Sequence, residues 1–290
     1  MSTPITSPPA RSRVLTMRGI GKHFGAVKAL TDVDFWVNEG EVVALIGDNG
    51  AGKSTLVKIL AGVHPPDGGT IEFDGEVVDI GSPADSQELG IETIFQDLAL
   101  CDNLDVVGNL WLGRELTSSG GLDEVEMEQR TWSLLRELSA KIPSVRIPVA
   151  ALSGGQRQTV AIARSLIGEP RIVILDEPTA ALGVAQTAEV LNLIVRLRER
   201  GHGVVLISHS MADVLAVADR VVVLRLGRNN GDFNAVEVTS ETLVSAITGA
   251  SGARVSPKEA GAPKTGGGRI IKMPPSGTPR RPGRAKGSDQ

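Results

Sequence analysis

The sequence predicts an α/β fold: a mixed, mostly parallel sheet that carries helices and has an antiparallel edge. Residues 171–226 alternate apolar strand patterns with helical patterns, which is typical of βαβ units. Residues 41–46 form a continuous apolar run, and a glycine-rich segment and a helical pattern follow it directly. Two short strand patterns at residues 70–73 and 77–80 flank Asp74-Gly75-Glu76, which indicates a hairpin.

Each element is predicted from its own pattern. The strand patterns lie at residues 33–37, 41–46, 70–73, 77–80, 171–175, 204–208 and 220–226. The helical patterns lie at residues 53–61, 123–141, 154–167, 184–200, 211–217 and 241–249. The alternation of residues 33–37 indicates an edge strand, whereas the run at 41–46 indicates a buried one. The helix at 123–141 is predicted to face the core with Val125, Leu134, Leu135 and Leu138.

The composition is that of an ordinary soluble globular protein. Of the 290 residues, 41% are hydrophobic and 22% are charged. No apolar run approaches the roughly 18–20 residues that span a bilayer, and residues 1–13 lack the apolar core of a secretory signal. The single cysteine, Cys101, excludes an internal disulfide and a zinc site built on cysteines.

The charge of the chain is divided unequally. Residues 251–290 carry nine Lys/Arg against two Asp/Glu, whereas residues 1–250 carry 21 against 32. An acidic body argues against nucleic acid as a partner. We predict one domain, residues 14–249, between a disordered lead (residues 1–13) and a basic, Gly/Pro-rich disordered tail (residues 250–290). A weak attachment of the tail to anionic lipid is the alternative.

The glycine-rich segment, residues 47–55, matches G-x-x-x-x-G-K-[ST] between a strand and a helix. Such glycines let consecutive N–H groups point at a phosphate, Lys53 can reach the β- and γ-phosphates, and the Ser54 hydroxyl can bind Mg²⁺. The alternative is a glycine-rich turn before an ordinary helix. The candidate nucleotide-binding residues here are Gly47, Asn49, Gly50, Ala51, Gly52, Lys53, Ser54 and Thr55.

Two carboxylates follow the apolar strand at residues 171–175. The carboxyl ends of parallel strands line the ligand crevice of such a sheet. Asp176 would therefore lie by the Mg²⁺ and hold its waters, and Glu177 would orient and deprotonate an attacking water. A solvated Asp-Glu pair in a loop is the alternative.

Residues 152–156 read LSGGQ, and Gln156 precedes Asp176 by 20 residues. With the glycine-rich loop before it and the acidic strand end after it, this pentapeptide resembles the signature of an ATP-binding cassette (ABC) ATPase. The resemblance implies a helical subdomain at about residues 97–168. It also implies a head-to-tail dimer of two cassettes, with an identical copy as the expected partner. The signature residues of one copy would cap the ATP on the loop of the other, namely Ser153, Gly154, Gly155 and Gln156.

The same resemblance assigns three further residues. Gln96 matches the Q-loop glutamine, which touches Mg²⁺ or the attacking water, and His209 matches the switch histidine beside the γ-phosphate. Phe24, 23 residues before Gly47, matches the aromatic that lies against adenine. A phenylalanine of the core is the alternative reading of Phe24.

One position departs from the family pattern, because Gly183 stands where most cassettes carry an aspartate; this puts the coupling between protomers in doubt. Leu182-Gly183-Val184 and residues 19–30, 109–115 and 208–214 resemble ATPases of bacterial monosaccharide importers. The resemblance implies a peripheral subunit on the cytoplasmic face of the membrane. Membrane permease subunits would dock at about residues 97–115, and an extracytoplasmic sugar-binding protein would deliver the sugar.

Three other functions remain open within the same family. A soluble ABC ATPase of translation, DNA repair or resistance is disfavoured by the single cassette and by the 55 residues between Gln96 and Leu152, which lack sustained heptads. An exporter is disfavoured by the absence of a fused membrane span. Gly183 is the only support for a non-catalytic regulatory cassette, against which the four residues of the chemistry are intact: Lys53, Asp176, Glu177 and His209.

Overall fold

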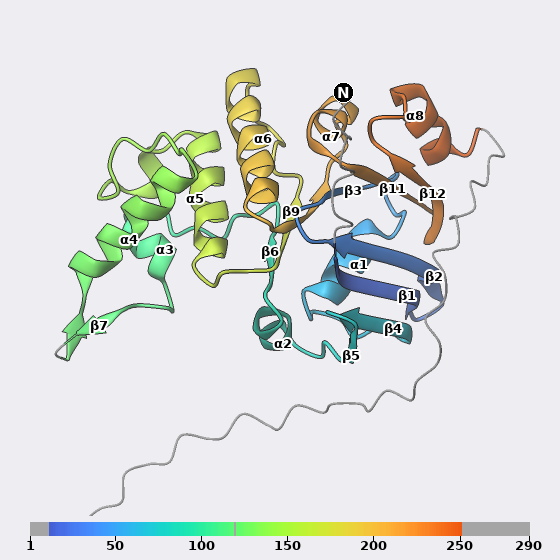
Figure 1. Ribbon diagram of the computed structural model, residues 1–290, viewed down its shortest axis with the longest axis horizontal. Helices are drawn as coiled ribbons and strands as arrows, with labels where there is room; N and C mark the ends of the chain where they lie inside the picture. Colours follow the sequence, from blue (N-terminus) through green and yellow to red (C-terminus); the bar gives the residue numbers. More distant parts are fainter. Residues whose placement is uncertain (1–11, 119, 251–290) are drawn as a thin grey trace, which may run out of the picture.

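The computed structural model describes residues 12–118 and 120–250. Its centre is a six-stranded sheet with the strands β3 (Val42–Ile46), β6 (Ile91–Ile94), β9 (Ile172–Asp176), β10 (Gly203–Ile207), β11 (Arg220–Arg225) and β12 (Arg228–Asn234). The strand order is β12-β11-β3-β10-β9-β6, and only the pairing of β11 with β12 is antiparallel (Figure 1). The predicted α/β fold with a mixed, mostly parallel sheet is therefore confirmed.

A second, antiparallel sheet lies beside the first. Its strands are β1 (Arg13–Phe24), β2 (Val27–Asn38), β4 (Gly68–Phe73) and β5 (Glu76–Val78), in the order β2-β1-β4-β5. The strand predicted at residues 33–37 is the second half of β2, and it does lie at the sheet edge. β1 begins inside the predicted disordered lead, whose residues 1–11 lie outside the described part of the chain.

Helix α1 (Lys53–Leu60) packs between the two sheets. Leu56, Ile59 and Leu60 share one buried cluster with Phe35 of β2 and Leu45 of β3. The opposite face of the six-stranded sheet is covered by α6 (Val184–Glu199), α7 (Met211–Val217) and α8 (Ser240–Thr248). A short helix, α2 (Pro83–Glu88), precedes β6. Because both faces of the six-stranded sheet are covered, only the ends of its strands remain accessible to a ligand.

The remaining helices gather at one end of the molecule (Figure 1). They are α3 (Val106–Trp111), α4 (Glu124–Glu137), the 3₁₀ turn η1 (Val149–Ala151) and α5 (Gly154–Leu166), with a small hairpin of β7 (Thr117–Ser118) and β8 (Gly121–Leu122). The predicted face of α4 is partly wrong, because Val125 is 68% exposed. Leu135 and Leu138 are buried as predicted and Leu134 is half-buried, while Met127 and Thr131 complete the buried face. The helix ends at Glu137 rather than residue 141.

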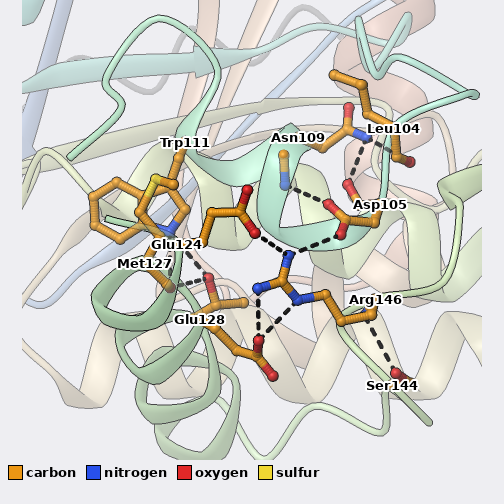
Figure 2. A network of polar contacts seen from close by, with 11 residues as sticks. Leu104, Asp105, Asn109, Trp111, Glu124, Met127, Glu128, Ser144 and Arg146 are labelled. Carbon is orange, nitrogen blue, oxygen red and sulfur yellow. Dashed lines mark hydrogen bonds and ion pairs between the residues drawn. The ribbon is translucent and has the colours of Figure 1, made fainter. Parts of the chain in front are cut away.

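A network of polar contacts fixes α3 against α4 (Figure 2). Arg146 lies 2.7 Å from Glu128, 3.3 Å from Glu124 and 3.6 Å from Asp105, whose side chain also caps α3. The Trp111 indole donates to the Met127 carbonyl at 3.1 Å. The carboxylates raise the pKa of Arg146 further above its usual value. The segment that precedes α3 is therefore attached to a well-anchored helix pair.

The strand register brings four functional segments to one edge of the sheet. Ile207 pairs with both Leu45 and Asp176, and Leu175 pairs with Ile94. Because these strands are parallel, the segments after β3, β6, β9 and β10 leave the sheet side by side. Among the described helices, none is long and apolar enough to cross a bilayer.

Candidate functional site

The loop at residues 47–55 is wedged between the two sheets. At Gly47 (φ +152°) a Cβ would lie 2.2 Å from the carbonyl oxygen of Leu224 on β11, and at Gly52 (φ +104°) it would lie 2.6 Å from Leu30 on β2. Gly50 has φ +78°, yet a Cβ there would meet nothing within 4 Å. The loop thus packs against protein on one side and is open on the other.

The open side has donors for an anion. The first N–H groups of α1 have no acceptor within the helix, and the helix dipole places partial positive charge there. Lys53, at the first position of α1, is buried and donates to the carbonyl oxygens of Gly47 at 2.7 Å and Asp48 at 3.1 Å. Ser54 is exposed and Thr55 half-buried, so the Ser54 hydroxyl is accessible.

Charged groups of opposite sign surround Lys53. Burial lowers the pKa of Lys53, and the negative charges of Glu177, Asp176 and Asp48 oppose that shift. Burial also raises the pKa of Asp176, which the positive charge of Lys53 opposes. Lys53 and Asp176 are thus both partly desolvated. Desolvation strengthens the attraction of each side chain to a ligand charge of the opposite sign.

Glu177 lies in a strained backbone position directly after β9. Its φ is +53°, and its N–H donates to the Ile207 carbonyl of β10 at 3.0 Å, which holds the turn. The backbone N–H of His209 donates to Glu177 Oε2 at 3.4 Å, and His209 Nε2 lies 3.2 Å from Glu177 Oε1. Burial raises the pKa of Glu177, which the neighbouring His209 opposes.

The Oε1 atom of Glu177 is buried and accepts no hydrogen bond from the described residues, despite the short distance to His209. A buried carboxylate oxygen without a donor is costly. A water molecule at this position would satisfy it. The geometry therefore fits a carboxylate that positions and deprotonates water.

Gln96 follows β6 after one residue and is exposed. The register of β6 with β9 places it at the same sheet edge as Asp176. Nearby Thr93 carries a second buried oxygen without a described hydrogen-bond partner. Sequence reasoning missed Thr93, because a lone threonine in a strand carries no functional pattern.

The residues that could hold Mg²⁺ supply the oxygen atoms that this ion prefers: the Ser54 hydroxyl, the Asp176 carboxylate and the Gln96 amide. In the described ranges there is no group of three or more His, Cys, Asp or Glu side chains that could bind a metal. The donor set therefore fits an ion that is completed by phosphate oxygens and water rather than a protein-only metal site.

Ser153 caps α5 within a capping box. Its hydroxyl accepts from the Gln156 N–H at 3.3 Å, and its own N–H donates to Gln156 Oε1 at 3.0 Å. A Cβ at Gly154 or Gly155 would come to 3.0 Å from Leu182 or Gln186, so the glycines let α5 approach α6 closely. The exposed Ser153 and Gly154 leave this helix start facing outward.

Phe24 ends β1 and is 45% exposed, so the alternative that places it in the core is wrong. Its ring meets His64 edge to face at 5.3 Å, with Lys22 5.6 Å from its centroid. Phe24 pairs with Val27 on β2. Val27 lies three residues, or about 10 Å at strand spacing, from Leu30, which lies beside Gly52 of the glycine-rich loop. An exposed aromatic at that distance from a phosphate loop can stack on a base.

Gly183 has no backbone requirement for glycine. Its φ is −73°, a Cβ would meet nothing within 4 Å, and the residue caps α6. The adjacent Val184 is 91% exposed. The missing aspartate therefore changes the surface beside Leu182 and the signature glycines, and it does not alter the fold.

Comparisons with known proteins point to one family. A family model described as ABC transporter matches residues 30–180. The xylose/arabinose import ATP-binding protein of Sulfolobus acidocaldarius is 47% identical over 217 residues, which cover 75% of this chain and 86% of that protein. The fructose import ATP-binding protein of Rhizobium meliloti is 42% identical over 259 residues, 87% of this chain and 98% of that protein.

Solved structures share the fold. An ATP-binding cassette of an ABC transporter in its ADP conformation has a TM-score of 0.70 at 27% identity, covering 81% of this chain and 95% of that one. A dimeric, post-hydrolysis ATP-binding cassette bound to ADP and Pi has a TM-score of 0.64 at 25% identity, covering 76% and 98%. On its sequence, its fold and the arrangement of its strand-end residues, the chain belongs to the ABC transporter family as an ATP-binding cassette.

Proposed function

We propose that this chain is the ATP-hydrolysing subunit of a membrane importer for a monosaccharide. The observation that carries the proposal is the meeting of the glycine-rich loop, Asp176, Glu177 and His209 at one sheet edge, where Glu177 keeps a buried oxygen without a donor. The transport role draws support from the two relatives, which are named as sugar import ATP-binding proteins.

The glycine-rich loop would bind the nucleotide phosphates. The N–H groups at the start of α1 donate to phosphate oxygens, and Lys53 moves its ammonium group from the carbonyl oxygens of Gly47 and Asp48 to the β- and γ-phosphates. Phe24 stacks on the adenine ring. Bound Mg²⁺ would neutralise developing charge on the phosphates, with Ser54, Asp176 and Gln96 as its protein-side partners.

Glu177 would act as the general base. Its Oε1 accepts a proton from the water while the water oxygen attacks the γ-phosphorus, and ADP is the leaving group. His209 lies close enough to Glu177 to hold this water and the γ-phosphate in line. Positioning and charge stabilisation supply most of the catalysis in such a reaction.

Two cassettes would share each nucleotide. Ser153 and Gly154 face outward at the start of α5, so this helix N-terminus is accessible to an anion from outside the chain. Placed against the glycine-rich loop of a second copy, they complete the γ-phosphate site. A solved relative of this fold is dimeric.

The permease would contact a cavity of about 370 Å³ beside Gln96. Its walls come from β6, α3, α5 and the loop after Gln96, and they include Ile94, Phe95, Leu98, Leu112 and Arg114. Phe95 and Leu112 are exposed apolar side chains at its rim. A cavity with such a rim suits a short helix of a membrane protein. Docking there would place this chain at the cytoplasmic face of the membrane.

Affinity purification of the tagged chain from membranes in mild detergent tests the proposal. A permease with several membrane spans is expected to elute with the chain, and loss of that partner is expected for Leu112→Asp. The matched control is Leu122→Asp, because Leu122 is exposed on β8 and does not line the cavity. A chain that stays in the soluble fraction without a membrane partner would contradict the transport role and favour a soluble ABC ATPase.

A further inference from the structure

Two arginines of α5 hold the loop that follows Gln96. Arg164, in the last turn of α5, donates to the carbonyl oxygens of Leu98 at 2.8 Å and Ala99 at 2.7 Å. Arg157, in the first turns, lies 3.7 Å from the Asp102 carboxylate. The two arginines are seven positions apart and so lie on one face of the helix. We name this pair of contacts the arginine clasp.

Arg164 is the stronger half of the arginine clasp. It is only partly exposed, and burial lowers its pKa from the usual arginine value. Hydrogen bonds from a charged donor are the stronger class, and the rigid guanidinium fork matches two adjacent carbonyls in a way that an ammonium group cannot. Ala99 has φ +47°, a backbone position that a side chain disfavours. Locally the Ala99 N–H donates to the Asp97 carboxylate at 3.2 Å, and Arg164 adds two longer-range hydrogen bonds that hold this conformation against α5.

The other half of the loop belongs to α3. The fully buried Asn109 accepts from the Cys101 N–H at 2.7 Å and donates to the carbonyls of Cys101 at 2.9 Å and Leu104 at 3.2 Å. The loop is therefore tied to α5 at its start and to α3 at its end. In both cases a side chain binds main-chain atoms of the loop, so these hydrogen bonds hold the loop backbone itself.

Helix α5 joins this loop to the signature residues. The helix has 13 residues, about 20 Å at 1.5 Å per residue, with Ser153 capping its start and Arg164 near its end. The loop begins two residues after Gln96, and Leu98, Ala99 and Arg164 line the 370 Å³ cavity. A displacement of the cavity wall therefore acts on Arg164 and through a rigid helix on Ser153.

We propose that Arg164 is a positioning residue that fixes the loop after Gln96 to the helix that carries Ser153, so that the cavity beside Gln96 and the signature residues move together. This inference rests on the proposed function. Arg164 is not among the residues assigned above to the nucleotide or to the attacking water, and its hydrogen bonds go to the carbonyls of Leu98 and Ala99. Its effect reaches catalysis through the placement of Gln96 in its own chain and of Ser153 toward the partner.

The test compares Arg164→Met and Arg164→Lys with the parent chain. Arg130→Met is the matched control, because Arg130 is exposed on α4 and its ion pair is with Glu126 of the same helix. Four quantities are measured on each full-length chain: the affinity for ATP, the kcat and the KM of ATP hydrolysis, and the hydrogen exchange of the amides at 97–102 and 153–156 with and without ATP. Circular dichroism checks that each variant is folded.

Arg164→Met is expected to bind ATP within twofold of the parent, to lose at least tenfold in kcat, and to exchange the amides at 97–102 faster. Arg164→Lys is expected to recover part of kcat, because its ammonium group can hold one carbonyl. In the parent, ATP should protect both segments, and in Arg164→Met it should no longer protect 153–156. Arg130→Met should match the parent throughout.

A faster-exchanging loop with kcat within twofold of the parent would overturn the proposal, because Arg164 would then only stabilise the loop. Equal losses of kcat and ATP affinity would also overturn it. A parent chain that binds ATP without hydrolysing it would contradict the proposed ATPase instead. In that case the proposal stands or falls on whether Arg164→Met loses the ATP-dependent protection of 153–156.

Discussion

Glu177→Gln is expected to stop ATP hydrolysis without loosening the fold. The amide keeps the shape of the carboxylate but cannot accept a proton from water. Loss of a positioned general base costs about 10²–10⁴ in rate, or roughly 2.7–5.4 kcal/mol at 1.36 kcal/mol per factor of ten. Because burial raises the pKa of Glu177, its charge is disfavoured in the folded chain. The neutral variant should therefore melt no lower than the parent.

The assay is phosphate release from MgATP, beside size-exclusion chromatography with ATP. The variant should keep its affinity for ATP and elute as a stable dimer, since it can bind the nucleotide but not cleave it. Glu189→Gln is the control: Glu189 lies on α6 with an exposed contact to Lys141 at 3.5 Å, and its replacement should leave the rate unchanged. Hydrolysis by Glu177→Gln at the parent rate would refute the role of Glu177 as base.

Four further changes have outcomes set by the local structure. Gly52→Ala should weaken ATP binding and lower stability by about 1–3 kcal/mol, because the position combines φ +104° with a close approach of β2. Gly50→Ala, in open space, should melt higher than Gly52→Ala while ATP titration shows a similar loss of affinity. Gly183→Asp should leave the melting temperature unchanged or slightly raised, since an aspartate N-cap can accept the Gln186 N–H; a clear drop would contradict the open geometry. Phe24→Ala should raise the KM for ATP by about 5–150-fold, the equivalent of roughly 1–3 kcal/mol of base stacking, with little change in kcat, and an unchanged KM would exclude the adenine contact.

Much of the central sheet could be predicted because its strands are apolar throughout. β3, β9 and β10 are buried on both faces. β9 and β10 lie between clear helical patterns, and β3 is followed by one. β12 was missed, since Arg228–Asn234 is polar and gains its strand structure from pairing with β11. β1 was missed because several register shifts break its alternation. Such pairings are tertiary and leave no periodic signal.

The candidate site was predictable where a motif carries its own chemistry. The glycine-rich loop needs glycine at φ values that other residues disfavour, and the capping box of Ser153 is visible as S-x-x-Q. Arg164 could not be predicted as a link to the loop, because its partners are carbonyls 65 and 66 positions away. The division into a cassette and a helical subdomain and the roles of the site residues remain predictions.

The central claim is that the glycine-rich loop of one copy and Ser153 of another form one ATP site. Asn49 and Ser153 are both exposed, and Cys101 is the only cysteine of the chain. In a Cys101→Ser background, Asn49→Cys and Ser153→Cys chains are mixed and oxidised with or without ATP. We expect a cross-linked dimer only in the mixture and only with ATP. No cross-link in the mixture with ATP, or one that forms equally without nucleotide, would contradict the account.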